Sequence, residues 1–345
     1  MSNDPKVLHV VKWYPHATDP QNGIFVKKHI EATSESPLVL GFVNSHDPLV
    51  EHEGVQVFGA RRMSQVAKFG AFTARIKVDQ PEIIHFHCFA PDLLPLLWYA
   101  RRKGIITLHT EHGSAFLPER LHLLRGWKRK AARWYFRRLN ECSCISPALI
   151  EGITTLAGNR KVHLIPNVVS TASNKRTSTP ISYSFCVVAD VVFETKAQEI
   201  ILEGFQQLPQ ARAELHFYGG GPDLERLKLK AQALPNVWVH GRKTNAEILQ
   251  LLPYHNALIL HSHYETFGIT VFEARTAGLW VVAKSNFGGA PWYDDGVRIA
   301  DTQDALVTQM QALIDKENPS IGKFDELSKE AIGHKILQLY REILG

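Results

Sequence analysis

Short apolar runs rich in Val, Ile and Leu alternate along most of the chain with longer segments of helical periodicity. In the first half the runs are KVLHVVKW, PLVLGFVN, EIIHFHC, GIITLHTE, ECSCIS and VHLIPN, and in the second half SFCVVADV, AELHFYGG, VWVHGRK, ALILHS and WVVAKS. Near-continuous apolar strands separated by helices are typical of a mostly parallel sheet with helices on both faces. The alternation therefore predicts an α/β protein of the doubly wound type.

The alternation is interrupted once, at residues 168–182, VVSTASNKRTSTPIS, a largely polar stretch rich in Ser and Thr that we interpret as a linker. A chain of 345 residues also exceeds the size at which one core keeps growing. We therefore predict two Rossmann-like domains, over residues 1–167 and 183–324, with a cleft between them and ligands at the carboxyl ends of their strands. Residues 325–345 carry apolar side chains at helical spacing and predict a final helix.

The composition excludes several classes of protein. No apolar run approaches the roughly 18 residues that a membrane span requires. The N-terminal segment MSNDPKVLHVVKW has no basic leader and only a short apolar run, so we expect a cytoplasmic protein. Four cysteines lie in apolar, strand-like surroundings, and we expect buried free thiols at Cys88, Cys142, Cys144 and Cys186.

The net charge of +5 is unevenly distributed. Residues 119–138 hold eight Lys or Arg against one acid, or +7, so the rest of the chain sums to −2. Aromatic and basic side chains share this stretch at helical spacing, which suits an anionic membrane surface. A solvated helix that covers its own domain is the alternative, and nucleic acid is disfavoured because no recognisable binding motif accompanies the charge. The candidate patch for the membrane or an acceptor consists of Trp127, Lys128, Arg129, Arg133, Trp134 and Arg137.

The segment HYETFGITVFEA contains Glu265 and Glu273, separated by seven residues. A retaining glycosidase would need its two carboxyl groups roughly 5 Å apart, whereas eight helical steps separate the α-carbons by about 12 Å. A helix that begins just after the Thr-Phe-Gly turn explains the segment better. Its first N–H groups, at Gly268, Ile269 and Thr270, would then bind a diphosphate, with one glutamate on either side.

These residues resemble the signature of a known family. The E-x7-E pattern, the TFG turn, the EA-x-x-A-G run that follows and the glycines at 288 and 289 are similar to the retaining nucleotide-sugar glycosyltransferases of family 4, the group 1 transferases of GT-B fold. The resemblance extends over most of the chain. It implies two Rossmann-like doubly wound domains that face a central cleft, with helix 325–345 crossing back onto the first domain.

The resemblance also implies roles for particular residues. Glu265 would contact the donor sugar near the reaction centre, Glu273 the nucleotide ribose, and Lys196 the donor phosphates. His112 would be the active-site histidine, with His109 as its substitute. The donor-binding residues that the resemblance implies are Gly23, Lys196, Gly219, Arg242, Thr266, Phe267, Gly268, Ile269, Thr270 and Glu273.

Two departures from the family pattern motivate a non-catalytic alternative. Asp190 stands where the family usually has an arginine, and Trp292 stands where a glutamate is common. A nucleotide-sugar-binding subunit without turnover would tolerate both changes. Asp294 and Asp295, nearby, are interpreted as a turn.

The histidines suggest a third class, a metal-dependent hydrolase. His85-x-His87 and His109-x2-His112 lie at the ends of consecutive predicted strands, as metal ligands often do. No carboxylate or cysteine set completes the site, and the nucleotide-domain pattern would remain unexplained. We therefore expect no metal ligands.

The resemblance therefore implies a retaining glycosyltransferase that moves a sugar from a UDP- or GDP-sugar to a glycan or lipid-linked acceptor. No Asp-x-Asp metal-binding pair occurs in the chain, so protein dipoles and cations are expected to stabilise the leaving diphosphate without a metal or other cofactor. Such enzymes serve cell-surface polysaccharide or lipopolysaccharide biosynthesis, and we expect this one at the inner face of the cytoplasmic membrane.

Overall fold

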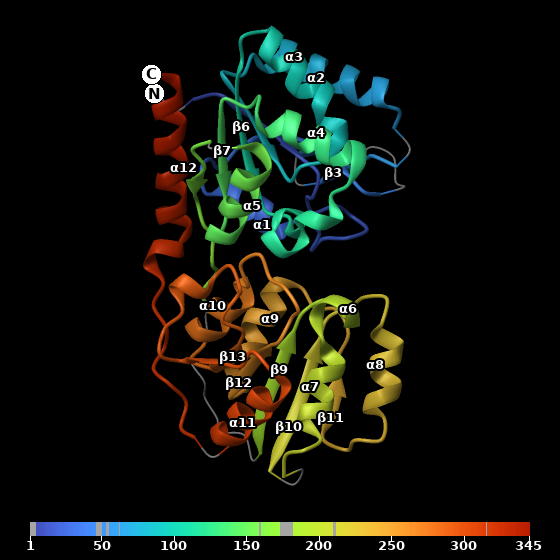
Figure 1. Ribbon diagram of the computed structural model, residues 1–345, viewed down its shortest axis with the longest axis vertical. Helices are drawn as coiled ribbons and strands as arrows, with labels where there is room; N and C mark the ends of the chain where they lie inside the picture. Colours follow the sequence, from blue (N-terminus) through green and yellow to red (C-terminus); the bar gives the residue numbers. More distant parts are fainter. Residues whose placement is uncertain are drawn as a thin grey trace. The chain divides into compact units, whose positions relative to one another are not determined.

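The computed structural model describes residues 5–45, 50–52, 55–61, 63–158, 160–172, 182–209, 212–314 and 316–345. The chain divides into two compact units, each a sheet with helices packed around it (Figure 1). Unit 1 comprises Met1–Val168 and Glu326–Gly345, and unit 2 comprises Val169–Asp325. Most of the predicted linker, residues 173–181, lies outside the described residues, and its first two residues, Val168 and Val169, are buried.

Unit 1 is built on an eight-stranded sheet with the order β3-β4-β2-β1-β5-β6-β7-β8. Every neighbouring pair is parallel except β3 with β4, which is antiparallel. The strands are β1 (Val7–Val11), β2 (Leu38–Val43), β3 (Val50–His52), β4 (Val55–Gly59), β5 (Ile83–His87), β6 (Ile106–Glu111), β7 (Glu141–Cys144) and β8 (His163–Leu164). The apolar runs predicted all the strands of this sheet except β3 and β4.

The helices of unit 1 are α1 (Ile24–Glu31), α2 (Gln65–Asp79), α3 (Leu94–Arg102), α4 (Gly126–Phe136), α5 (Pro147–Ala157) and α12 (Lys329–Leu344), with short 3-10 turns η1 (Pro91–Leu93), η2 (Ser114–Phe116) and η3 (Pro118–Leu123). Ser328 begins α12 by accepting a hydrogen bond from the N–H of Ala331. The apolar face of α12, which includes Ile336 and Tyr340, packs against Ile83 of β5 and Leu108 of β6.

Unit 2 has a six-stranded, fully parallel sheet with the order β11-β10-β9-β12-β13-β14. Its strands are β9 (Tyr183–Val188), β10 (Ala213–Tyr218), β11 (Val237–Val239), β12 (Ala257–Leu260), β13 (Trp280–Ala283) and β14 (Val297–Ile299). Its helices are α6 (Phe193–Lys196), α7 (Gln198–Phe205), α8 (Leu224–Ala231), α9 (Asn245–Leu251), α10 (Ile269–Thr276) and α11 (Gln303–Leu313), with 3-10 turns η4 (Leu252–Tyr254) and η5 (Ala290–Trp292). The 3-10 turn η6 (Asp325–Leu327) spans the boundary between the units and precedes α12.

Parallel strands place all their carboxyl ends at one edge of the sheet, so loops far apart in sequence meet there. In unit 2 the loops after β9, β10, β11 and β12 come from four neighbouring strands. In unit 1 the loops after β4, β2, β1, β5 and β6 come from five neighbouring strands. All four cysteines are buried and free, as predicted. Within the described part of the chain, no helix is both long enough and apolar enough to cross a membrane.

Candidate functional site

Unit 2 brings Lys196 and Glu265 together. Lys196 ends α6, just after β9, and Glu265 lies in the loop after the neighbouring strand β12. The ammonium Nζ of Lys196 lies 2.6 Å from Oε2 of Glu265. Burial lowers the pKa of Lys196, but the charges of Glu265 and Asp190 outweigh this effect and hold the pKa above its usual value. A fully charged lysine is therefore held at the carboxyl edge of the sheet.

The backbone beside Lys196 is strained. Ala197 has a φ of 52°, a left-handed conformation that costs a residue with a Cβ roughly 1–2 kcal/mol. This residue separates α6 from α7 and turns the chain between them. A hydrogen bond of 2.9 Å from the N–H of His263 to the carbonyl oxygen of Thr195 ties the turn to the loop that carries Glu265.

Helix α10 begins directly after this loop, at Gly268. The glycine has φ 80° and ψ 53°, and no side chain caps the helix. The first N–H groups of an α-helix lack partners within the helix, so the residues at this end, Ile269 and Thr270, present the positive end of the helix dipole. Thr266 is half-buried beside it. The helix begins where the TFG turn predicts, and its end is not filled by a capping side chain.

Phe267 packs its ring into the interior of unit 2 at this turn. Its ring is only 1% exposed and lies 5.5 Å, centroid to centroid, from the ring of Trp292. A Cβ on Gly289 would come within 2.2 Å of the carbonyl oxygen of Phe267, so only glycine allows the two loops to approach. Trp292, the departure from the family pattern, thus packs against the phenylalanine of the turn.

Glu273 lies on the fifth residue of α10 and is only 1% exposed. Its Oε1 accepts a hydrogen bond of 3.0 Å from the side-chain amide of Asn245, the first residue of α9. The carboxylate is therefore held between two helices. The sequence had not suggested Asn245 as its partner, because the two residues are brought together only by the sheet order.

Gly219 explains the close packing of three loops. A Cβ at this position would lie 1.8 Å from the carbonyl oxygen of Ala189, and the N–H of Gly219 donates to the carbonyl of Gly241 at 2.9 Å. Next to this contact, an exposed ion pair of 3.6 Å joins Arg242 to Asp190. Arg242, from the loop after β11, therefore pairs with the residue that departs from the family pattern.

The predicted turn at Asp294 and Asp295 is confirmed, because the N–H of Val297 donates to the carbonyl oxygen of Asp294 at 3.0 Å, but Asp294 also has a second role. The guanidinium of Arg275, which is 1% exposed, donates to both carboxylate oxygens of Asp294, from Nε at 2.7 Å and from Nη2 at 3.0 Å. Arg275 also donates to the carbonyl oxygens of Leu279 and Ser320. Asp294 is the counter-ion of a buried cation, a role that a local turn pattern does not reveal. Asp295 remains exposed.

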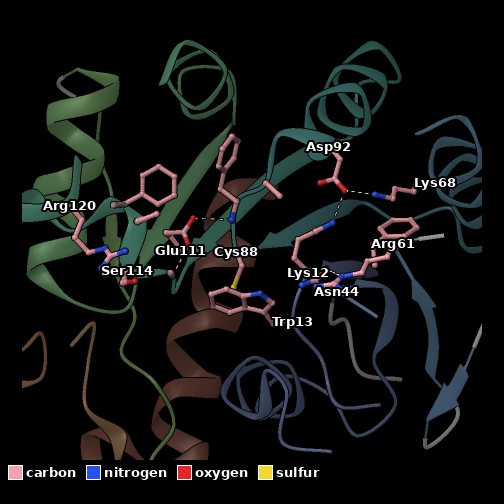
Figure 2. Close-up of a pocket in the computed structure, with 17 residues that line it drawn as sticks. Lys12, Trp13, Asn44, Arg61, Lys68, Cys88, Asp92, Glu111, Ser114 and Arg120 are labelled. Atoms are coloured by element: carbon pink, nitrogen blue, oxygen red, sulfur yellow. Dashed lines mark hydrogen bonds and ion pairs between the residues drawn. The ribbon is translucent and has the colours of Figure 1, made fainter. Parts of the chain in front are cut away.

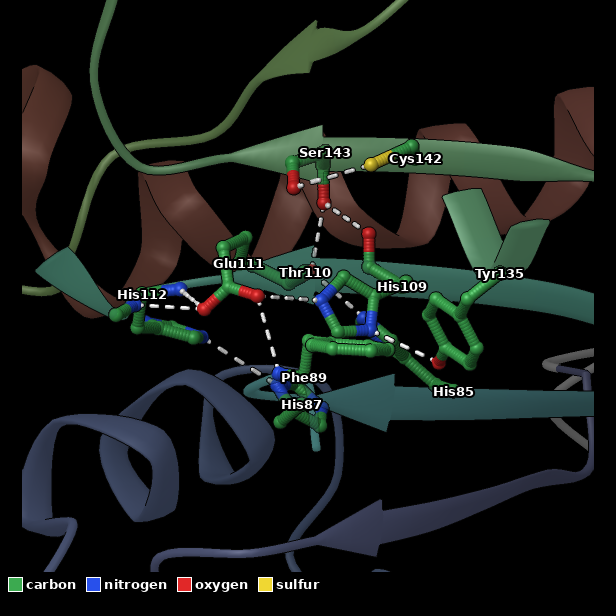
Figure 3. A network of polar contacts seen from close by, with 11 residues as sticks. His85, His87, Phe89, His109, Thr110, Glu111, His112, Tyr135, Cys142 and Ser143 are labelled. Carbon is green, nitrogen blue, oxygen red and sulfur yellow. Dashed lines mark hydrogen bonds and ion pairs between the residues drawn. The ribbon is translucent and has the colours of Figure 1, made fainter. Parts of the chain in front are cut away.

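In unit 1, His112 lies just after β6 and is 3% exposed (Figure 3). Its Nδ1 lies 3.2 Å from Oδ1 of Asn167, and its Nε2 lies 3.4 Å from Nδ1 of His87. Burial lowers the pKa of His112 well below its usual value, and the nearby His29 lowers it further. His112 is thus a neutral imidazole. His109, the substitute, instead contacts Tyr135 and Glu111.

Gly23 caps α1 with a φ of 64°, and a Cβ there would lie 2.4 Å from the carbonyl carbon of Trp13. Only glycine lets these two segments approach so closely. Gly23 therefore fixes the loop that follows β1.

Three buried histidines, His9, His85 and His87, place one ring nitrogen each within 4.8 Å of the others. Nδ1 of His9 lies 3.2 Å from Nε2 of His87, a separation that ligands of one metal ion can have. Both ring nitrogens of His85, however, already contact hydroxyl groups at 2.7 Å, those of Tyr340 and Thr110. An ion could bind all three only after His85 gave up one of these bonds. The donor set therefore fits a structural network better than a catalytic metal.

A cavity of about 510 Å³ opens in unit 1 at the carboxyl ends of β4, β2, β1, β5 and β6 (Figure 2). Lys12 and Lys68 both contact Oδ2 of Asp92, each at 2.7 Å. The lining residues used below are Lys12, Trp13, Arg61, Lys68, Phe89, Asp92, Glu111, Phe116 and Arg120. None of the basic residues of this cavity was a sequence candidate, because they are scattered over loops and a helix that only the fold assembles.

Glu111 holds the walls of this cavity together (Figure 3). Its Oε1 accepts from the backbone N–H groups of His112 and Gly113, and its Oε2 accepts from the N–H of Phe89 and contacts His109. Both oxygens of this buried carboxylate are thus satisfied by its own unit. Cys88, with a left-handed φ of 61°, turns the chain so that Phe89 can make its contact.

The predicted basic patch lies on α4 and its ends. Helix α4 buries Ala132, Tyr135 and Phe136 and leaves Trp127 64% exposed. Lys128 and Arg133 are exposed, whereas Trp134 is half-buried against Arg138. Arg129 donates to the carbonyl oxygen of Leu121, and Arg137 to that of Ala157. Part of the patch therefore supports its own unit, and part faces solvent.

Two α/β units in sequence, the first with a largely parallel sheet and the second with a fully parallel one, match the domain organisation expected of a GT-B glycosyltransferase. Residues 174–330 match the family described as Glycosyl transferases group 1, and residues 39–173 match the one described as Glycosyltransferase Family 4. The chain therefore belongs to the glycosyltransferases of the group 1, family 4 type, and the resemblance inferred from the sequence is confirmed. No curated protein matches the chain by sequence.

Several solved structures share the fold. Sucrose-phosphate synthase from Thermosynechococcus elongatus superimposes with a TM-score of 0.77 at 17% identity, covering 98% of this chain and 99% of the other. Anabaena HepE in complex with UDP-glucose superimposes with a TM-score of 0.68 at 14% identity, covering 98% of this chain and 96% of the other. The catalytic domain of starch synthase IV from Arabidopsis thaliana, bound to ADP and acarbose, gives 0.68 at 13% identity, covering 99% of each chain. The predicted GT-B fold class is thereby confirmed.

Proposed function

We propose that this glycosyltransferase uses a nucleotide-sugar donor and transfers the sugar with retention to a glycan or lipid-linked acceptor. The observation that carries the proposal is the 2.6 Å ion pair between Lys196 and Glu265 beside the uncapped start of α10. A diphosphate next to Lys196 and the helix N-terminus would meet a cation and free N–H groups together. UDP-glucose bound to HepE supports a uridine donor, and ADP bound to starch synthase IV supports a nucleotide in general.

In the proposed reaction, Lys196 and the N–H groups of Gly268, Ile269 and Thr270 stabilise the charge that develops on the leaving diphosphate. The bond from the anomeric carbon to the phosphate oxygen breaks, and a bond to the acceptor oxygen forms on the same face of the sugar. The departing phosphate oxygen takes the acceptor's proton. Glu265 contacts the sugar, so these protein groups supply the stabilisation without a required metal.

The remaining proposed roles follow the family. Glu273, held by Asn245, binds the ribose, and Arg242 and Gly219 lie beside the nucleotide. His112 is proposed to contact the sugar as a neutral imidazole, which its lowered pKa supports, and its Nε2 would exchange the contact with His87 for one with a sugar hydroxyl group. Gly23 fixes the loop after β1, and Thr266 and Phe267 form the turn that positions the amides of α10.

The decisive experiment is a thermal-shift screen of UDP, GDP, ADP and their glucose conjugates, followed by assay of donor cleavage. We expect one base to stabilise the protein, by roughly 2.7 kcal/mol at 100 times the dissociation constant. Glu265→Gln should then abolish sugar release and Glu273→Gln should weaken binding of the nucleotide. Nucleotide-sugar binding with no cleavage by the wild-type chain, under any acceptor tested, would favour the non-catalytic subunit instead.

We also propose that α4 places the protein on an anionic membrane surface at the inner face of the cytoplasmic membrane. The 64% exposed ring of Trp127, next to exposed Lys128 and Arg133, supports this placement, because aromatic and cationic groups suit the membrane interface. Lipid-linked acceptors reside there, so the proposal accords with the proposed acceptor class.

A further inference from the structure

The cavity of unit 1 has more positive than negative charge. Four basic side chains line it, Lys12, Arg61, Lys68 and Arg120, against two carboxylates, Asp92 and Glu111, which leaves a formal surplus of two positive charges. The volume of about 510 Å³ lies inside the range of roughly 300–1,000 Å³ typical of small-molecule sites. A site of this size and charge is suited to a small anion.

The two lysines share a single counter-ion atom. Nζ of Lys12 and Nζ of Lys68 both lie 2.7 Å from Oδ2 of Asp92, as Figure 2 shows. The other oxygen, Oδ1, is buried and accepts no hydrogen bond from the described residues. Burial lowers the pKa of Lys12 and Asp92 offsets this only in part, because the charge of Lys68 acts in the same direction as burial. One carboxylate therefore leaves the pair of ammonium groups with net positive charge.

The second carboxylate contacts groups other than the two lysines. Both oxygens of Glu111 are engaged by backbone N–H groups and by His109. Hydrogen bonds to the backbone stabilise its charge locally and hold the loops of the cavity in place. The positive potential at Lys12 and Lys68 thus remains available to a ligand.

Aromatic side chains complete the walls. Trp13, 39% exposed, Phe89 and Phe116 line the cavity with the basic groups. An apolar wall with a few placed polar groups is the usual construction of a site for a sugar-sized ligand. A divalent cation would be repelled by the charge surplus.

We propose that this cavity binds an acceptor that carries an oxyanion, a phosphate or a carboxylate group, with Lys12 and Lys68 holding the anion and the aromatic wall holding the adjoining sugar or lipid part. The inference rests on the proposed function, since it names the chemical class of the acceptor. The proposal adds to what the resemblance to the family implies, because the basic groups belong to this chain's own loops after β1 and β4 and to α2.

The test is calorimetric titration of the full chain with inorganic phosphate in the presence of saturating UDP, which would occupy the proposed donor site in unit 2. We expect phosphate to bind, and Lys68→Met to weaken binding at least tenfold. Lys77→Met is the matched control, because Lys77 lies exposed on the same helix, outside the cavity. Equal phosphate affinity in Lys68→Met and Lys77→Met would overturn the proposal. Arg61→Gln, an exposed change that the fold tolerates, should also weaken phosphate binding, which keeps the test valid if Lys68→Met misfolds.

Competition distinguishes the two kinds of anion. Glucuronate carries a carboxylate, glucose 1-phosphate carries a phosphate, and methyl glucoside is neutral. We expect at least one charged sugar to displace phosphate at tenfold lower concentration than methyl glucoside, and the stronger competitor identifies the group. Displacement by all three at the same concentration would contradict the proposal. UDP binding without phosphate binding would reject only this inference, whereas absence of nucleotide binding would reject the proposed function.

Discussion

Nζ of Lys196 and Oε2 of Glu265 lie 2.6 Å apart although 69 positions separate the two residues in sequence. They meet because β9 and β12 are neighbours in a parallel sheet, so the loops after both strands open at the same edge. Each residue therefore supplies the other's counter-charge. A change in either one alters the charge presented to a donor diphosphate.

Lys196→Met should weaken binding of the cognate nucleoside diphosphate by about tenfold to a hundredfold. A hydrogen bond to a charged group contributes roughly 1.5–3 kcal/mol, and 1.4 kcal/mol corresponds to a factor of ten. Calorimetric titration measures the affinity. Lys228→Met is the control, because it breaks an exposed ion pair of similar length, 2.8 Å to Glu225, in the same unit. Equal losses in both variants would remove Lys196 from the donor site.

Gly219→Ala should destabilise unit 2 by about 3 kcal/mol, at the upper end of overpacking effects, because the new Cβ would lie 1.8 Å from the carbonyl oxygen of Ala189. Thermal unfolding measures the loss. Gly241→Ala isolates the steric clash, since Gly241 lies in the same unit and also has a positive φ, of 74°, but its Cβ would meet nothing within 4 Å. That control should cost only about 1 kcal/mol. A smaller loss at Gly219 than at Gly241 would contradict this account of the turn.

Asp294→Asn should destabilise unit 2 by about 2–3 kcal/mol. The substitution leaves the guanidinium of Arg275 buried with its counter-charge removed, and the partial exposure of Asp294, 31% of its side chain, reduces the cost below that of a fully buried pair. Asp295→Asn, at the exposed neighbouring residue, should have almost no effect. Urea unfolding of the two variants measures the difference, and similar midpoints would show that the ion pair does not stabilise the unit.

Unit 1 should lose stability as the pH falls below about 6.5. Burial lowers the pKa of His9 to about 3 and that of His29 to about 4, and it lowers the pKa values of His85, His87 and His112 well below the usual value. Below pH 6.5 the unfolded chain binds protons that the folded unit does not. Each such histidine therefore subtracts about 1.4 kcal/mol per pH unit between 6.5 and its lowered pKa.

The measurement is the free energy of unfolding of unit 1 between pH 7.5 and pH 5. The free energy of unfolding should be highest near pH 7.5 and should decrease towards pH 5. His9→Gln, which removes one of these groups, should reduce the slope with pH by about one proton. An unchanged slope in that variant would mean that His9 is charged in the folded protein.

Charge reversal on α4 should abolish any membrane association. Lys128→Glu with Arg133→Glu changes the charge of the patch by four units, and each basic group near an anionic surface contributes about 1 kcal/mol. Flotation with vesicles that contain anionic lipid, compared with neutral vesicles, measures binding. Lys77→Glu with Lys103→Glu, on other exposed surfaces of unit 1, is the control. Equal flotation of the protein with anionic and with neutral vesicles would contradict the proposed placement.

The sequence predicted those parts of the structure that depend on local pattern. The longer apolar strands were found because each is a buried run of Val, Ile or Leu, and the start of α10 was found because a TFG turn precedes its apolar face. Strands β3, β4 and β14 were missed because their sequences, VEH, VQVFG and VRI, place a polar residue inside a short strand and so do not form an apolar run. The equally short edge strand β11, VWV, was found because it is apolar throughout.

Pairs that only the fold assembles could not be predicted. Lys12, Lys68 and Asp92 come from a loop, a helix and a short turn, and no spacing in the sequence relates them. The turn at Asp294 was predicted, but its ion pair with Arg275 was not, because 19 positions separate the two residues. Lys196 and Glu265 were both candidates, but the 2.6 Å contact between them was not foreseen.

The contact between His85 and Tyr340, which spans 255 positions, has a consequence for biosynthesis. Domains generally fold in the order in which the ribosome releases them. Here the hydroxyl group that binds the His85 ring, together with the apolar side chains that cover β5 and β6, arrives only with α12. The first unit to be translated is consequently the last to be finished, and a nascent chain that stalls within unit 2 would leave an apolar face of the earlier sheet open to chaperones and proteases.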